Sequence, residues 1–87
     1  MQKILVVDDA AVNREMLREM LEDNYDIEMA ENGQQALRKL LEYKGVLTAV
    51  LLDLQMPEME GYAVSDAMKE NGWLEQIPVL AISIERT

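Results

Sequence analysis

Acidic side chains directly follow two strongly apolar stretches of this sequence. Asp8 and Asp9 end the run Ile-Leu-Val-Val, and Asp53 ends the run Thr-Ala-Val-Leu-Leu. Short, continuous apolar runs rich in β-branched residues are typical of strands buried on both faces of a parallel sheet. Reactive groups of such sheets gather outside the carboxyl ends of the strands. If these two strands are neighbours, we expect the three carboxylates to meet in one crevice.

Carboxylates crowded in this way need a compensating charge. Two of them about 4 Å apart repel by about 4 kcal/mol at an effective dielectric constant of about 20. Mg²⁺ offsets such repulsion, and it commonly binds one or two carboxylates together with waters and a phosphate oxygen. A carboxylate can also act as a nucleophile toward phosphorus. We therefore predict that Asp8 and Asp9 clamp a Mg²⁺ ion and that Asp53, alone at its strand end, accepts a phosphoryl group.

Ser83 is a further candidate, because it ends another apolar run, Val-Leu-Ala-Ile. Its hydroxyl can donate a hydrogen bond to a phosphoryl oxygen and, by turning toward it, report the charge of the acceptor. Taken singly, Ser83 is more simply structural, and an aspartate after a strand is often only a turn former or helix cap. The matching positions of these residues at several strand ends favour the functional interpretation.

The elements that would position these residues alternate between strand and helix. Apolar runs or alternation predict four strands, at Ile4–Val7, Tyr25–Ala30, Thr48–Leu52 and Val79–Ile82. Apolar spacing of three and four residues predicts helices from Val12 to about Asp23, around Ala36 to Leu41, and from about Gly61 to Asn71. This order predicts right-handed crossovers and a parallel, helix-covered sheet. We interpret Asn32-Gly33 as a turn before the second helix.

Composition excludes several functions. The 87 residues contain 8 Lys and Arg and 17 Asp and Glu, so the net charge of −9 disfavours direct binding of nucleic acids or anionic membranes. Cysteine and histidine are absent, so metal ligands must be oxygens, which suit Mg²⁺. The apolar run near the N-terminus is too short for a signal peptide or a membrane span. We expect a cytoplasmic protein.

From Gln2 to Ser83, the chain resembles the receiver domain of two-component response regulators. The acidic pair of that family matches Asp8 and Asp9. Its phosphoacceptor, in the context Leu-Leu-Asp-Leu-Gln-Met-Pro-Glu-Met-Glu-Gly, matches Asp53, and its switch residue after an Ile-Pro-Val strand matches Ser83. Gln55 stands at the position whose backbone carbonyl is a metal ligand in that family. The resemblance implies a flavodoxin-like α/β sandwich and Mg²⁺-dependent phosphoryl transfer from a sensor histidine kinase or phosphotransfer protein.

The sequence departs from the family pattern near its end. A complete receiver continues through a fourth helix, a fifth strand and a fifth helix, about 35 to 40 more residues, whereas this sequence stops at Thr87. We therefore expect residues 1–87 to form one partial receiver domain with strand order 2-1-3-4, lacking the family's fifth-strand lysine. The strand Val79–Ile82 would then lie at an exposed sheet edge, which favours homo-oligomers.

Other functions were weighed against this one. A haloacid-dehalogenase-like phosphatase needs a second aspartate where Gln55 stands, and the Asp8-Asp9 pair would repel the phosphate of a flavin in a flavodoxin. The remaining alternative is a receiver that is not phosphorylated and serves as an interaction or dimerisation module. Under either receiver interpretation we expect no enzymatic activity of the chain itself.

Overall fold

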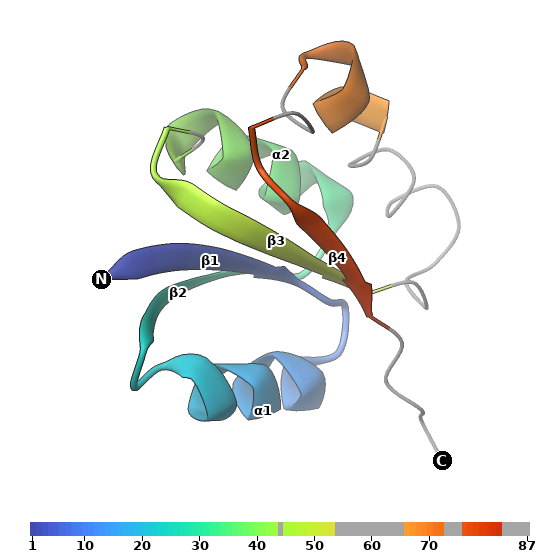
Figure 1. Cartoon of the computed structure of the whole chain (residues 1–87). Helices are drawn as coiled ribbons and strands as arrows, with labels where there is room; N and C mark the ends of the chain where they lie inside the picture. Colours follow the sequence, from blue (N-terminus) through green and yellow to red (C-terminus); the bar gives the residue numbers. More distant parts are fainter. Residues whose placement is uncertain (44, 54–65, 73–75, 83–87) are drawn as a thin grey trace.

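A parallel sheet organises the part of this protein that the structure describes. The computed structural model describes residues 1–43, 45–53, 66–72 and 76–82. The strands and helices in chain order are β1 (Gln2–Val7), α1 (Ala11–Leu21), β2 (Tyr25–Ala30), α2 (Gly33–Tyr43), β3 (Leu47–Asp53) and β4 (Val79–Ile82). The sheet has the order β2-β1-β3-β4, and its neighbouring strands are parallel (Figure 1). The predicted flavodoxin-like α/β sandwich with strand order 2-1-3-4 is confirmed.

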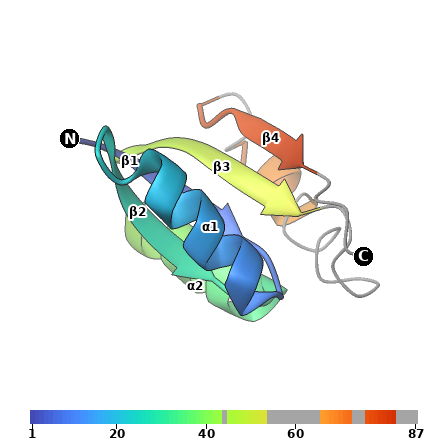
Figure 2. The same ribbon diagram turned by 90° about the horizontal axis from the view of Figure 1, so that it is seen from below.

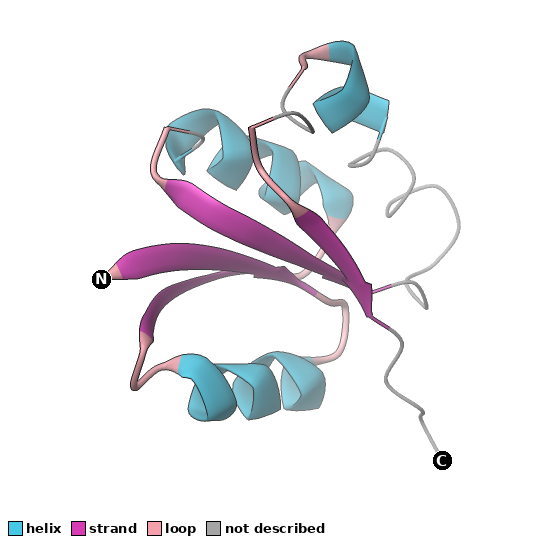
Figure 3. Ribbon diagram, in the orientation of Figure 1, coloured by secondary structure: helices cyan, strands magenta, loops and turns pink. Residues whose placement is uncertain are grey.

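Helices cover both faces of the sheet (Figures 2 and 3). Successive residues of a strand point to opposite faces, so β1 and β3 contribute apolar side chains to two separate clusters. The larger cluster lies on the α2 side and includes Leu5, Val7, Ala36, Leu40, Val50 and Leu52. The smaller cluster on the α1 side is formed by Ile4, Val6 and Leu51. Burial on both faces explains why these two strands read as continuous apolar runs.

The described part of the predicted third helix lies on the α2 side. Residues 66–70 are helical, and the fully buried Met68 packs into the larger cluster. The chain leaves this helix at Gly72, whose φ of 72° lies in the left-handed region that glycine tolerates best. Residues 61–65 of the prediction lie outside the described residues.

The chain bends at Asn32 as the turn prediction expected, and Asn32 also caps α2, which begins at Gly33. The side-chain oxygen of Asn32 accepts a hydrogen bond from the backbone N–H of Gln35 at 2.8 Å, and the Gln35 side chain accepts one from the N–H of Glu31 at 3.1 Å. This exchange satisfies donors that a helix start leaves without helical partners. The sequence indicated the turn but not the cap, because asparagine favours turns and helix caps for the same reason, a short side chain that bonds nearby backbone.

Helix α1 is amphipathic as predicted, but only part of its apolar face is buried. Leu17 and Leu21 pack against the smaller cluster. Val12, Met16 and Met20 are 79%, 40% and 67% exposed. The spacing of apolar residues does not distinguish these five positions from one another. The sheet beneath α1 does, because it covers only the side of the helix that Leu17 and Leu21 occupy. Among the described residues, no helix has the length and apolar character needed to cross a membrane.

Candidate functional site

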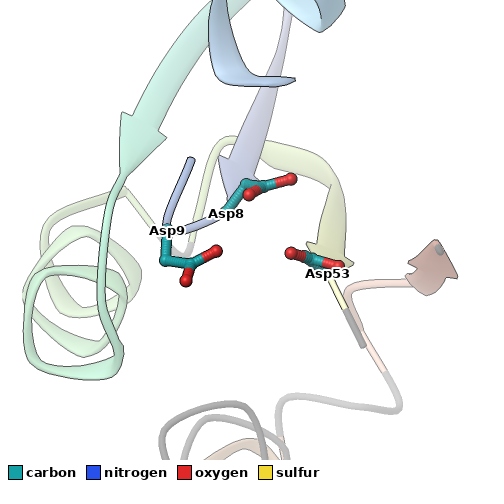
Figure 4. A group of neighbouring side chains, drawn as sticks. All are labelled: Asp8, Asp9 and Asp53. Carbon is teal, nitrogen blue, oxygen red and sulfur yellow. The ribbon is translucent and has the colours of Figure 1, made fainter. Parts of the chain in front are cut away.

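Three carboxylates meet at the carboxyl edge of the sheet (Figure 4). Asp8 directly follows β1 and Asp53 ends β3, and these two strands are hydrogen-bonded neighbours. Asp8, Asp9 and Asp53 each offer a carboxylate oxygen, and these oxygens lie within 4.8 Å of one another. Asp8 is 0% and Asp53 1% exposed, whereas Asp9 is accessible to solvent. The structure thus brings the three predicted aspartates together.

Backbone contacts fix the position of Asp8. Its N–H donates to the carbonyl of Ala30 at the end of β2, at 3.1 Å. Its side-chain oxygen Oδ1 accepts a hydrogen bond from the N–H of Ala10 at 2.9 Å. Ala10 is the N-cap of α1 and has no capping side chain of its own. The turn from β1 into α1 is therefore stabilised by the same carboxylate that lines the site.

Arg14 is a residue whose role the sequence did not reveal. Charged residues between the apolar positions of an amphipathic helix are usually solvated, but the Arg14 side chain is only 15% exposed. Its Nη1 donates to the backbone carbonyl of Asp8 at 2.7 Å, and its Nη2 lies 3.7 Å from the carboxylate of Glu31. Arg14 therefore ties the first turn of α1 to the chain segments that follow β1 and β2. Its position near the start of α1, six residues after Asp8, was the available signal.

Burial changes the acid–base behaviour of Asp8. Removal from water raises the pKa of Asp8 above its ordinary value, and the neighbouring charge of Asp53 raises this pKa further. The N–H of Ala10 and the side chain of Asn13 act in the opposite direction, because both favour the charged form. The net direction is upward. A carboxyl in this position holds its proton to a higher pH than a surface aspartate does.

The donor set suits a hard divalent cation. At 4.8 Å, the greatest separation among the three oxygens, two charged carboxylates repel by about 3.5 kcal/mol at an effective dielectric constant of about 20. The three groups supply oxygen ligands, which Mg²⁺ prefers. Asp8 and Asp53 are held by rigid strand ends, whereas Asp9 faces solvent, where waters can complete a coordination shell. The residues present therefore fit Mg²⁺ by number, charge and chemistry.

Two predicted site residues, Gln55 and Ser83, lie outside the described residues. The strand before Ser83 does place its end at the site edge, since Ile82 of β4 is the register partner of Asp53.

Comparison with known proteins identifies this arrangement. The family model for the response regulator receiver domain matches residues 4–87. The chain belongs to this family. It is 49% identical over 69 residues to the transcriptional regulatory protein ResD of Bacillus subtilis, which covers 78% of this chain and 28% of ResD.

Solved receiver structures have the same fold. The chemotaxis protein CheY4 of Vibrio cholerae matches with a TM-score of 0.84 and 30% identity, over 100% of this chain and 72% of CheY4. The response regulator TrrA of Thermotoga maritima, solved in complex with Mg²⁺ and BeF, matches with a TM-score of 0.80 and 36% identity, over 95% of this chain and 70% of TrrA.

The receiver domain described here spans between 4% and 66% of the length of eight curated relatives. They range from transcriptional regulators to a probable cyclic di-GMP phosphodiesterase and hybrid histidine kinases. The receiver module is thus the part these otherwise different proteins share with this chain.

Proposed function

We propose that this receiver domain accepts a phosphoryl group on Asp53, in a Mg²⁺-dependent reaction, from the phosphohistidine of a sensor histidine kinase or a phosphotransfer protein. The observation that carries the proposal is the gathering of Asp8, Asp9 and Asp53 within 4.8 Å at the carboxyl edge of the sheet. Membership of the receiver family and the Mg²⁺ complex of TrrA support it. We infer a cytoplasmic setting, because the donor kinase draws on cytoplasmic ATP.

Asp53 is the acceptor in this proposal. One of its carboxylate oxygens forms a bond to phosphorus as the bond from phosphorus to the histidine nitrogen breaks, and that nitrogen keeps the electron pair and takes up a proton. The product is an aspartyl phosphate and a free histidine on the donor. The chain is the recipient of the group and completes no catalytic cycle of its own.

The other site residues hold and balance charge. Asp8, Asp9 and Asp53, with the backbone carbonyl of Gln55, would hold Mg²⁺, which when bound offsets the negative charge of the carboxylates and the phosphoryl oxygens. The backbone hydrogen bonds of Asp8 orient its carboxylate before any ligand arrives. The Ser83 hydroxyl would donate to a phosphoryl oxygen and so act as the switch.

The proposal is tested by labelling with phosphoramidate, a small donor with a phosphorus–nitrogen bond. Intact-mass spectrometry should detect one added phosphoryl group in the presence of Mg²⁺ and none in EDTA. Asp53→Asn should abolish labelling, whereas Asp23→Asn, the same change at an exposed position, should retain it. Labelling of Asp53→Asn to the wild-type level, or labelling that EDTA leaves unchanged, would refute the proposal.

A second candidate function is supported by the surface of the sheet. β4 is an edge strand of the described sheet, and Leu80 is 55% exposed. Leu80 is the register partner of Leu51, so it points to the α1 side, the side that carries the exposed Val12 and Met16. Exposed apolar residues along an open edge favour association with another chain, as in an interaction or dimerisation module.

Sedimentation velocity distinguishes this second candidate. If the β4 edge mediates dimerisation, the wild-type chain should sediment as a dimer at micromolar concentration and Leu80→Lys as a monomer, since a charge on the edge blocks pairing. Val46→Lys, at an exposed apolar position before β3, is the control. A wild-type monomer across the concentration range would rule out this edge as a homodimer interface.

A further inference from the structure

Asn13 occupies a position on α1 where the helix otherwise places leucine. Residues 13, 17 and 21 are spaced by four and lie on one side of the helix. Leu17 and Leu21 of this row pack against the smaller apolar cluster. Asn13, only 7% exposed, is at the end of the row that is nearest to Asp8. A polar side chain has therefore been placed in an inward-facing position beside the carboxylates.

The Asn13 amide has a buried donor to offer. Its nitrogen Nδ2 is fully buried and has no hydrogen-bond partner among the described residues. Polar groups buried in this way are costly unless they are satisfied, and leucine at this position would avoid the cost. The Asn13 amide thus lowers the stability of the folded protein at this site. A group that does so is expected to have a function when a ligand is bound.

The acceptor nearest in function to this donor is the carboxylate of Asp8, with which the Asn13 side chain interacts. The Asn13 side chain interacts with Asp8 and favours its charged form. Asp8 is already held through Oδ1 by the N–H of Ala10 and through its backbone carbonyl by Arg14. The Asn13 amide is therefore buried close to a carboxylate that already accepts one hydrogen bond, and its own nitrogen Nδ2 completes none among the described residues.

We propose that Asn13 is a positioning residue of the metal site, whose buried amide N–H donates to the Asp8 carboxylate when a divalent cation is bound and so keeps that carboxylate in its binding orientation. The inference rests on the proposed function, since it concerns the same acidic site. Groups that hydrogen-bond to metal ligands commonly contribute about 10- to 100-fold to metal affinity, because they fix the ligand and stabilise its charged form. Asn13 does so from the first turn of α1.

The test measures Mg²⁺ affinity directly. Isothermal titration calorimetry with MgCl₂ is performed on the wild type, on Asn13→Leu, which keeps similar volume without the amide, and on Asn13→Ala. Glu19→Ala, at an exposed position of the same helix, is the control. We expect the dissociation constant for Mg²⁺ to rise about 10- to 100-fold in both Asn13 variants and to stay within about twofold in the control.

Two further measurements separate positioning from a purely structural role. In phosphoramidate labelling, the Asn13 variants should need a higher Mg²⁺ concentration to reach half of their maximal rate. Their rate at saturating Mg²⁺ should change less. In the wild type, the side-chain amide resonances of Asn13 should shift on addition of Mg²⁺, and those of the exposed Asn24 should stay in place. The NMR measurement needs no variant and decides the matter even if both substitutions prevent folding.

The possible outcomes are distinct. If the wild type binds no Mg²⁺, the proposed function itself fails. If the wild type binds Mg²⁺ and Asn13→Leu binds it within twofold of the wild type, only the role of Asn13 is overturned. Reduced stability to urea in EDTA with unchanged Mg²⁺ affinity would assign Asn13 to packing and would also overturn the inference, as would unshifted Asn13 resonances.

Discussion

The substitution Asp53→Asn should stabilise this receiver domain in the absence of Mg²⁺ and lose most or all of that advantage when Mg²⁺ is present. Asp53 is 1% exposed and lies within 4.8 Å of Asp8 and Asp9, measured between carboxylate oxygens. At that distance each charged pair repels by about 3.5 kcal/mol at an effective dielectric constant of about 20. Asp9 is accessible to solvent, so screening weakens its repulsion with Asp53. The repulsion between Asp53 and Asp8 therefore dominates. We expect Asp53→Asn to stabilise the metal-free protein by about 2 to 3 kcal/mol.

Magnesium should remove most or all of this advantage. A ligand at 100 times its dissociation constant stabilises the folded state by about 2.7 kcal/mol. A domain of this size changes its melting temperature by about 4 to 8 °C for each kcal/mol. Wild-type protein should therefore gain at least about 10 °C in saturating Mg²⁺. Asp53→Asn loses a ligand and should gain much less, so its advantage in EDTA shrinks or disappears.

Thermal unfolding followed by circular dichroism measures both effects. The wild type, Asp53→Asn and the exposed control Asp23→Asn are each melted in EDTA and across a MgCl₂ titration, at constant ionic strength so that screening is matched. Asp23→Asn should follow the wild type in both conditions. The reasoning is refuted if Asp53→Asn is less stable than the wild type in EDTA, or if Mg²⁺ raises the melting temperature of both proteins equally.

Three further predictions concern pH and packing. The pKa of Glu28 is lowered by hydrogen bonds from Lys39 and Lys3, at 2.7 and 3.4 Å, so its contribution to stability is present above pH 4.5 and is lost as pH falls through the lowered pKa. Glu28→Gln should cost about 1 to 2 kcal/mol in urea unfolding at pH 7 and flatten this acid dependence, and an unchanged curve would contradict it. The pKa of Asp8 is raised, so a proton should compete with Mg²⁺ more strongly here than at a surface aspartate. Calorimetry should therefore find weaker Mg²⁺ binding at pH 5 than at pH 7.5. Equal affinities at the two pH values would argue against Asp8 as a ligand. Met68→Ala should cost about 2 to 5 kcal/mol in urea unfolding, because Met68 is fully buried in the α2-side cluster, whereas a small loss would indicate that residues 66–70 contribute little to the core.

Much of the fold could be predicted because its signals are local. Ile4–Val7 and the run before Asp53 are continuous apolar segments, and a strand buried on both faces requires that composition. Their polar ends mark where the strands stop, and the order of elements leaves few topologies open. The four strands followed from these rules, whereas their order came from the resemblance to receiver domains. That order makes the first and third strands neighbours, the condition for Asp8, Asp9 and Asp53 to converge, and the structure confirms both the order and the convergence.

The tertiary structure decided what depends on contacts between elements. Periodicity showed that α1 is amphipathic, but only the position of the sheet determines that Leu17 and Leu21 are buried and that Val12 and Met20 are exposed. The sequence cannot show that the Arg14 guanidinium reaches the backbone carbonyl of Asp8, because this contact depends on how α1 packs.

The acidic site shows the same division. Its residue types were determined by the sequence, because an oxygen-only set of ligands at strand ends follows from the absence of histidine and cysteine and from the order of the strands. The burial of Asp8 and Asp53, the raised pKa of Asp8 and the orientation of its carboxylate were decided only by the folded structure. Desolvation of Asp8 and the charge of Asp53 come from groups that are distant in sequence and adjacent in space, so the burial and the raised pKa exist only once the strands and α1 have packed together. The hydrogen bond from Ala10 is local, but it forms only in the folded turn between β1 and α1.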